Sequence, residues 1–535
     1  MTGMKQGLRA ARLMGLLALA GCDSDPKAEP WDGLYTPLEE QGDIIADTGP
    51  FATCTVRKDI SAPCGSPEVF DLSSCNRASL DTLEREGAVY RGVVRVEYMQ
   101  PQREMATAGV GLRLSPDGRQ VEFLNGIASS SSQLGDGQFS ASMGYTNTAS
   151  GVYFEQFALG CEAVSPRELV GCYSYCADGS TYVHGTFRAE RMSWARGEAE
   201  SSGGLKLRSE SYVELGQSVD VFVAKDHAYV VSIQRRGEPG GLTVFDVKDR
   251  RRPVFKTSIS LPGDNYWNGV WSKGDALYVA SASSGLIVFD ISNPASPVFL
   301  QSYPGGGPLD IHTVLVDGDR LYAMSTGRNA EVLLFDVTTP TEPRLLHRES
   351  LGGIGTGIYG VPHDAFAYGD RLYVSHMSGG YQILDVRNPE NFEHLGEYTY
   401  YGAVSHHSAV GTLGGHTVAF EGGERQGAHL RVLKVDDPTN IELIGEFKLR
   451  DVASIHNMLL VGTRLYIAWY HEGLRVLDVS NPTKPRQVAH FNTYRESDPK
   501  REDGQYEGAL GIRVPGDGHV YVVDDARGLL IFDEP

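Results

Sequence analysis

The chain has 535 residues, more than one ordinary domain of about 100–200 residues accommodates. Hydrophobic residues make up 41% of it and charged residues 22%, which indicates a folded globular protein rather than a disordered one. The net charge is −20 and no cluster of Lys and Arg occurs, so nucleic acid is excluded as a partner, because phosphate binding requires clustered positive charge.

The first segment (residues 1–21) carries the features of a targeting signal. Lys5, Arg9 and Arg12 precede an apolar run that is too short for the roughly 20 residues of a membrane-spanning helix. Small residues then lead to Cys22, and this stretch resembles the lipobox of bacterial lipoproteins. The resemblance implies a signal peptide that is removed before Cys22, whose thiol is then lipidated. An ordinary secretory signal with an incidental cysteine is the alternative.

The same resemblance implies a place in the cell envelope, with the lipid as the link to the membrane. Two locations agree with this expectation: the periplasmic side of the inner membrane, and the outer membrane or cell surface. Residues 22–50 are acidic and contain Pro26, Pro30 and Pro37, a composition typical of an extended linker. We therefore expect a tether between the lipid and the first domain.

Six further cysteines all lie before residue 177. An even number in one region of an exported protein favours disulfide bonds, for which 15 connectivities exist. A metal site is the alternative for the last two, although their spacing differs from the Cys-x-x-Cys of zinc ribbons. The disulfide candidates are Cys54, Cys64, Cys75, Cys161, Cys172 and Cys176.

Residues 51–200 alternate between apolar and polar side chains, as strands do. One predicted strand covers Val89–Tyr98, and a Ser-Pro-Asp-Gly turn between Val110–Leu114 and Gln120–Leu124 predicts a hairpin. Further strands are expected at Gly137–Tyr145, Val152–Leu159 and Thr181–Met192, whereas Ser129–Ser132 is expected to form a polar loop. The pattern predicts a disulfide-braced antiparallel β-sandwich or small barrel.

From residue 207 onward, a strand of the pattern Leu-x-Val-x-Asp-Val occurs seven times, at intervals of 44 to 55 residues. A strand containing tyrosine precedes most copies, so each unit supplies about four short strands, the period of a β-propeller blade. We expect the repeated aspartate to fix the turn that follows it. The aspartates are Asp246, Asp290, Asp336, Asp385, Asp478 and Asp533, and the fifth copy has Lys434 in their place.

The repeated strand resembles that of the LVIVD family of bacterial and archaeal cell-surface proteins, and the resemblance covers residues 211–535. It implies a seven-bladed β-propeller over residues 207–535, and hence an all-β protein. The last unit supplies three strands. We therefore expect Leu207–Leu215 to add its outer strand, which removes a free sheet edge.

Histidines mark the starts of several innermost strands. Fourteen of the 15 follow residue 207, and three of them stand ten residues before a repeat tyrosine. These strand starts surround one mouth of a propeller's channel, where imidazoles can bind zinc, copper or iron. Alternatively, each histidine fastens its strand to the neighbouring backbone or to an aspartate. The candidate metal ligands are His312, His363, His407 and His456, with His406, His376 and His471 nearby.

No motif assigns catalytic residues, and no cofactor other than a transition metal is indicated. We expect an extracytoplasmic, lipid-anchored binding or scaffolding protein, whose partner is another envelope protein or an extracellular ligand. The alternative is a metal-dependent enzyme with a histidine-ligated ion at the channel mouth. In a third possibility the disulfide domain binds the ligand and the propeller is its platform.

Overall fold

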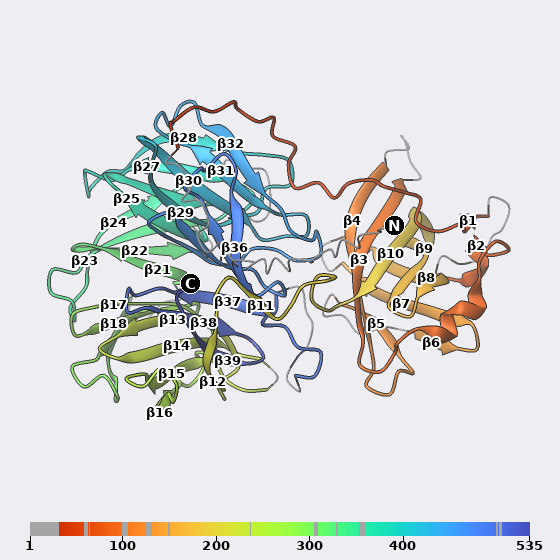
Figure 1. The fold of residues 1–535 in the computed structure, drawn as a ribbon, viewed down its shortest axis with the longest axis horizontal. Coiled ribbons are helices and arrows are strands. Elements are labelled where there is room, and N and C mark those ends of the chain that lie inside the picture. Colours follow the sequence, from red (N-terminus) through yellow and green to blue (C-terminus); the bar gives the residue numbers. More distant parts are fainter. Residues whose placement is uncertain are drawn as a thin grey trace, which may run out of the picture.

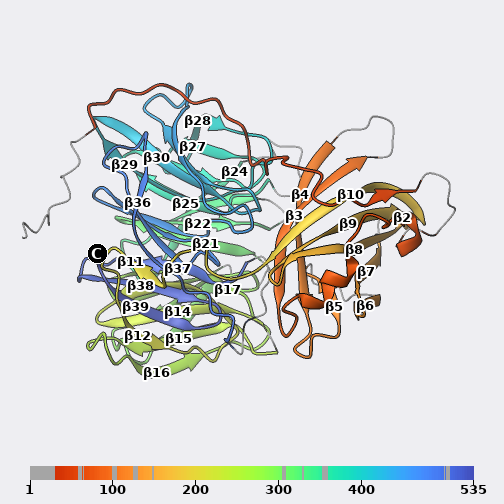
Figure 2. The same ribbon diagram turned by 45° about the vertical axis from the view of Figure 1, so that its right-hand side comes forward.

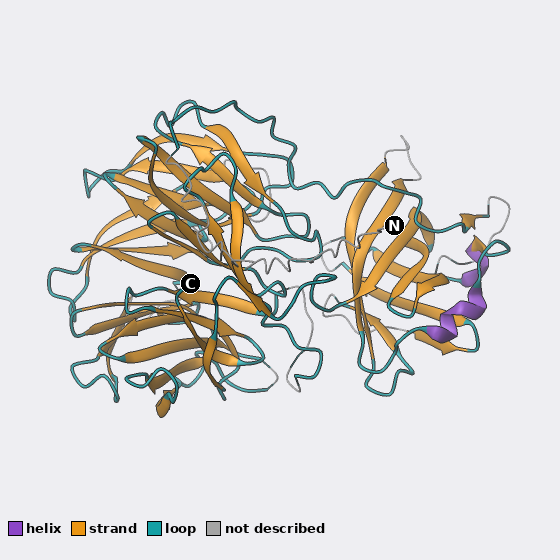
Figure 3. Cartoon of the chain, in the orientation of Figure 1, coloured by secondary structure: helices purple, strands orange, loops and turns teal. Residues whose placement is uncertain are grey.

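The computed structural model is an all-β protein with two bodies side by side, a smaller N-terminal domain and a propeller (Figures 1 and 3). In the part of the chain that it describes, no helix is long and apolar enough to cross a bilayer. The described residues are 31–57, 63, 65–98, 105–124, 131–147, 150–235, 237–303, 309–327, 330–351, 360–498, 501 and 506–535.

An eight-stranded antiparallel sheet, nearly closed into a barrel, forms the N-terminal domain. Its strand order is β5-β4-β3-β10-β9-β8-β7-β6, and β5 also lies against β6 and β7, which brings the two edges together. Alternate residues such as Val94 and Val96 point into its core. The strands are β3 (Val89–Tyr98), β4 (Met105–Leu114), β5 (Val121–Phe123), β6 (Ser131–Gly135), β7 (Gln138–Thr146), β8 (Tyr153–Ser165), β9 (Glu168–Ala177) and β10 (Ser180–Arg191).

The predicted strands are thus present, and of the two architectures expected for this domain the structure has the barrel. Two strands lie outside the prediction. Strand β9 is one of them, and β6 begins at Ser131, inside the stretch predicted to be a polar loop. Pairing with β7 accounts for β6, because its backbone hydrogen bonds compensate for its lack of apolar residues.

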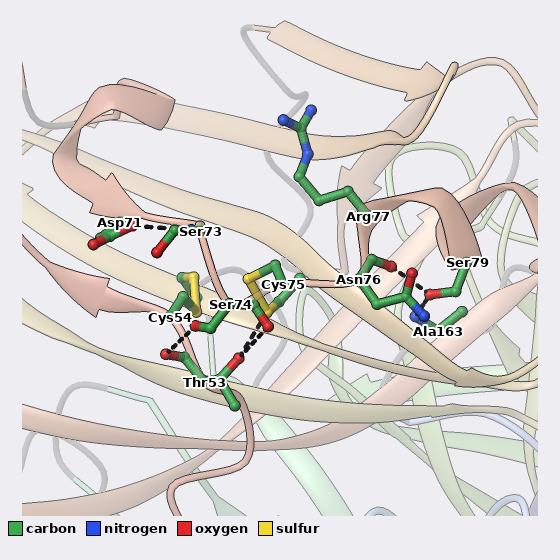
Figure 4. Close-up of a disulfide and its surroundings, with 12 residues drawn as sticks. Thr53, Cys54, Asp71, Ser73, Ser74, Cys75, Asn76, Arg77, Ser79 and Ala163 are labelled. Atoms are coloured by element: carbon green, nitrogen blue, oxygen red, sulfur yellow. Dashed lines mark hydrogen bonds between the residues drawn. A yellow bond between two sulfur atoms is a disulfide. The ribbon is translucent and has the colours of Figure 1, made fainter.

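Two disulfides fasten an arm that precedes the barrel, as Figure 4 shows. Cys54 is bonded to Cys172 in β9, and Cys75 to Cys161 in β8, so the arm is fixed to two adjacent strands. Cys176 is also disulfide-bonded, which excludes the metal site considered for the last two cysteines. Cys64 lies outside the described residues. The arm carries β1 (Thr55–Val56), β2 (Phe70–Asp71) and the 3-10 helices η1 (Pro67–Val69) and η2 (Arg77–Thr82).

The propeller has seven antiparallel blades, numbered here in chain order. Blades 1 to 3 are β13–β16 (Gln217–Ala224, His227–Ile233, Gly241–Asp246, Val254–Ile259), β17–β20 (Trp267–Lys273, Ala276–Ser281, Gly285–Asp290, Val298–Tyr303) and β21–β24 (Ile311–Asp317, Arg320–Ser325, Glu331–Asp336, Arg344–Ser350). Blades 4 and 5 are β25–β28 (Asp364–Tyr368, Arg371–Ser375, Tyr381–Asp385, Glu393–Tyr398) and β29–β32 (Ser405–Leu413, His416–Gly423, Leu430–Lys434, Glu442–Phe447). Blade 6 is β33–β36 (Met458–Val461, Arg464–Ala468, Leu474–Asp478, Arg486–Phe491), and blade 7 contains β37–β39 (Ala509–Arg513, His519–Asp524, Gly528–Asp533).

Blade 7 closes the ring with a strand from the other end of the propeller. As expected, β12 (Leu207–Ser211) pairs antiparallel with β39, with Ser211 opposite Leu529. Just before it, β11 (Ser201–Ser202) adds a fifth strand to blade 6 by pairing with β36. Both pairings cover strands that would otherwise be free edges.

The repeated residues hold neighbouring blades together. The buried Tyr229 of blade 1 donates a hydrogen bond to the Pro294 carbonyl of blade 2 (3.0 Å), and Tyr278 does the same to Pro340 of blade 3 (2.7 Å). The repeated aspartates accept from backbone two residues on, as Asp290 does from Ser292 (2.7 Å). Their predicted role in fixing turns is therefore confirmed at this position.

The segment predicted to be a free tether is instead packed on the propeller from residue 31 onward. We call residues 31–47 the strap; it crosses the outer edge of blade 5 and then reaches the barrel (Figure 2). At one end Trp31 is buried against Gly414, directly after β29. At the other, the Ile45 carbonyl accepts from Thr107 of the barrel (2.6 Å). The tether prediction missed these contacts, because they depend on single side chains and not on a strand pattern.

Candidate functional site

The innermost strand of each blade presents one residue to the propeller axis. In five blades the pairing of the first two strands shifts by one residue at this point, a β-bulge that redirects the extra side chain. In blades 4 and 6 the corresponding residue immediately precedes or lies two before the first strand. The seven axial residues, from blade 1 to blade 7, are Val219, Asn268, His312, His363, His406, His456 and Leu510.

Four consecutive blades therefore place imidazoles next to one another. The ring centroids of His312 and His363 are 4.1 Å apart, those of His363 and His406 are 4.1 Å apart, and those of His406 and His456 are 4.7 Å apart. Three of the four predicted ligands thus lie in one cluster. We call His312, His363, His406 and His456 the histidine cluster.

The fourth predicted ligand, His407, does not face the cluster. The bulge in β29 skips His406 and leaves His407 paired with Gly422, so successive side chains point to opposite sides. The Nε2 atom of His407 lies 3.5 Å from Asp364 instead. The structure therefore replaces His407 with His406 in the candidate site.

Backbone carbonyls orient two of these imidazoles. Nδ1 of His406 donates to the His456 carbonyl, and Nδ1 of His456 donates to the Leu510 carbonyl, both at 3.0 Å. The structural alternative considered above therefore describes both residues correctly. Yet each bond uses only one ring nitrogen, and a neutral imidazole keeps a lone pair on the other.

The other two histidines differ in their partners. Nε2 of His312 accepts from the Asn268 amide at 3.0 Å. Nδ1 of His363 is buried and has no hydrogen-bond partner among the described residues. An unpartnered buried nitrogen costs free energy, so it marks a position where a ligand would add a missing interaction.

Burial keeps the cluster uncharged. It lowers the pKa of His312 and of His456 to about 3 and that of His406 to about 4, and it lowers the pKa of His363 well below its usual value. Beside the cluster, burial raises the pKa of Glu424 above its ordinary value. Oε1 of Glu424 lies 3.5 Å from His406 Nε2 and accepts a hydrogen bond from the Tyr470 hydroxyl.

All seven axial residues line a cavity of about 590 Å³ at the mouth of the channel, here called the mouth cavity. Its other walls carry Asp310, Glu424 and three tyrosines, Tyr266, Tyr470 and Tyr506. Below the histidine cluster lies a second cavity of about 220 Å³, which His407 lines. The cluster thus separates the mouth from the interior of the channel.

The barrel domain covers the mouth of the channel. A cavity of about 700 Å³ lies between the two domains, walled by strap and β4 residues on one side and by propeller residues, most of them around blade 5, on the other. It shares Met377, Glu424 and Tyr506 with the mouth cavity. The two cavities therefore adjoin, and the cleft between the domains leads toward the histidine cluster.

The model of the LVIVD repeat matches residues 266–304 and 456–493, which correspond to blades 2 and 6. The chain carries LVIVD repeats. Among proteins of curated function, none matches this sequence. One crystal structure that resembles the chain is that of the computationally designed Ika8 protein, with 8% identity and a TM-score of 0.40, over 61% of this chain and 98% of that one.

The remaining predicted histidines of the LVIVD propeller lie outside the cluster. His471 accepts a hydrogen bond from Arg91 of the barrel (3.3 Å) and so belongs to the domain interface. His376 is buried but does not line the mouth cavity. Sequence reasoning missed Glu424 and Tyr470. Neither follows the repeat pattern, so no spacing rule indicated them.

Proposed function

We propose that this protein is an exported, lipid-anchored binding module, whose LVIVD propeller takes its ligand into the mouth cavity beneath the barrel domain. The observation that carries the proposal is the continuity of two cavities through Met377, Glu424 and Tyr506. A propeller alone would leave its mouth open. Here a second domain walls the approach, as in binding sites that lie between domains.

Export and anchoring are supported by chemistry in the N-terminal part of the chain. The disulfides Cys54–Cys172 and Cys75–Cys161 are bonds that form and persist in oxidising compartments. The lipobox-like stretch before Cys22 supplies the acylation site. Together they favour a place outside the cytoplasm, held to a membrane by lipid.

The lining of the mouth indicates which ligands suit it. Asp310 and Glu424 contribute carboxyl groups and the tyrosines contribute hydroxyls, the one arginine of this lining, Arg235, is paired with Glu507, and the whole chain has a net charge of −20. This environment disfavours anions and favours neutral polar or cationic groups. The ligand is therefore proposed to be a polar molecule, or an exposed part of another envelope protein with these groups.

The anchor is tested by metabolic labelling with palmitate in a bacterial host. The intact chain is expected to incorporate the label and to sediment with membranes, whereas Cys22→Ala is expected to do neither. Equal labelling of the two chains would contradict lipidation at Cys22.

Binding at the mouth is tested by photocrosslinking in the protein's own host. The photoreactive residue p-benzoylphenylalanine replaces Tyr401, which is 78% exposed beside the cavity between the domains. In a matched control it replaces Phe299, an exposed aromatic residue on the outer strand of blade 2. A defined adduct from position 401 alone supports the proposal. No adduct, or the same adducts from both positions, would contradict it.

A further inference from the structure

We infer that His363, His406 and Glu424 form the binding site of one divalent first-row transition-metal ion, an inference that deepens the proposed binding function of the mouth cavity. One ligand atom from each of the three residues lies within 4.8 Å of the other two. Small side-chain rotations would bring these atoms to the roughly 2.0–2.2 Å bonds that zinc makes with nitrogen and oxygen.

The three donors come from separate parts of the propeller and are held in place. His363 precedes β25 of blade 4, His406 lies in β29, and Glu424 follows β30 of blade 5. The backbone amide of His363 donates to the Ser375 carbonyl at 2.8 Å, which fixes its position at the start of the strand. Rigid strands of this kind are the scaffold that a metal site requires.

Outer hydrogen bonds orient two of the donors. The bond from His406 Nδ1 to the His456 carbonyl leaves Nε2, the atom nearest Glu424, with the lone pair. The Tyr470 hydroxyl donates to Glu424 and steadies its carboxylate. Such partners behind the ligands are the normal support of protein metal sites.

The unpartnered Nδ1 of His363, together with the closeness of the three donors, favours a metal site over a purely structural cluster. The structural explanation, in which each histidine fastens a strand, accounts for His406 and His456 but leaves this buried nitrogen without a bond. Coordination to a cation would satisfy it. His456 adjoins His406 and could add a further imidazole.

The donor set indicates the class of ion. Two imidazoles and one carboxylate suit Zn²⁺ and Fe²⁺, whereas Ca²⁺ and Mg²⁺ prefer oxygen ligands only. Three protein donors leave coordination positions free, and the mouth cavity that all three residues line gives access to them. The site is thus suited to holding an ion that itself contacts the ligand of the protein.

The inference is tested by titrating the full chain, purified in detergent and treated with chelator, with Co²⁺ alone. We expect one equivalent to bind, with visible absorption bands of a Co²⁺ ion in a nitrogen–oxygen site. His363→Ala and the near-isosteric Glu424→Gln should each abolish the bands. Tyr470→Phe, which loses an outer bond only, should weaken binding about 10–100-fold.

His407→Gln is the matched control, because this residue is a buried neighbour of His406 that faces away from the cluster. It should bind Co²⁺ as the unmodified chain does. Thermal unfolding in chelator shows whether each variant is folded. The inference fails if the unmodified chain binds no Co²⁺, or if Glu424→Gln binds it equally well. Crosslinking at position 401 does not depend on this result, so failure of the metal site and failure of the binding module are distinguished.

Discussion

Arg431 and Arg475 occupy the same position of the repeat in blades 5 and 6, where the other blades have Thr, Ile, Leu or Gln. Both are fully buried. Arg431 donates to Glu40 and lies 2.9 Å from Asp43 of the strap, and Arg475 lies 3.1 Å from Glu198, just before β11. Each departure from the repeat therefore marks a blade against which a segment outside the propeller packs.

The first prediction concerns Arg431→Gln. The change leaves Asp43 buried without the counter-charge of Arg431, since both side chains are fully buried. We expect the free energy of unfolding to fall by about 3–5 kcal/mol, the typical cost of breaking a buried ion pair. Denaturation in urea at pH 7 measures it.

The control for this prediction is Arg486→Gln. Arg486 is 62% exposed and lies 3.4 Å from Asp478, so its loss should cost less than about 1 kcal/mol. Equal losses in the two variants would show that burial of Arg431 does not matter.

At the scale of elements, the inner strands carry the site. Sequence spacing identified three of the seven axial residues, His312, His363 and His456, because each stands ten residues before a repeat tyrosine. Blade 5 broke this rule. It has Phe420 where others have tyrosine, and its longer first hairpin, β29 and β30, shifts the count. Only the pairing register, which a sequence does not reveal, selects His406 over His407.

The second prediction uses this equivalence of blades. His312→Asn gives blade 3 the residue that blade 2 has at Asn268. The folded-state pKa of His312 is near 3, below the ordinary value of 6.5, because burial disfavours the charged ring. The unfolded chain therefore binds a proton first as the pH falls. The stability that neutral His312 contributes is complete above pH 6.5 and is lost as the pH falls toward 3.

The intact chain should accordingly lose about 1.4 kcal/mol more per pH unit than His312→Asn does below pH 6.5. Unfolding in urea at pH 7, 5.5 and 4 measures the difference between the two chains, in which contributions of other groups cancel. Parallel pH profiles would mean that His312 is not buried in its neutral form.

At the scale of the whole molecule, the repeat predicted the propeller and its closure, whereas the sequence left the relation of the two domains open. Periodic strands leave a periodic signal, but the strap and the domain interface depend on single contacts such as Arg91 with His471. The position of the barrel domain over the mouth cavity could therefore not be predicted from the sequence. It is nonetheless the feature on which the proposed function depends.

The strap also sets how an anchored molecule would face its membrane. Trp31 packs beside Gly414, which directly follows β29 at the end opposite Ser405 and the mouth. Strand β29 has 9 residues, so the mouth lies about 30 Å from that end. Trp31 stands nine positions after Cys22, which limits their distance to about 30 Å. If Cys22 carries the lipid, as proposed, we expect the end of blade 5 distal to the mouth to lie nearer the bilayer than the mouth does.

The last prediction tests this orientation by energy transfer to a dye in the bilayer. Leu34→Cys places a label on the strap beside Trp31, and Tyr401→Cys places one near the mouth; the two side chains are 76% and 78% exposed. In the vesicle-anchored protein, transfer should be stronger from position 34. Cys22→Ala should abolish it at both positions. Equal or stronger transfer from position 401 would place the mouth against the lipid, and the ligand would then have to arrive from the bilayer instead of from the aqueous side.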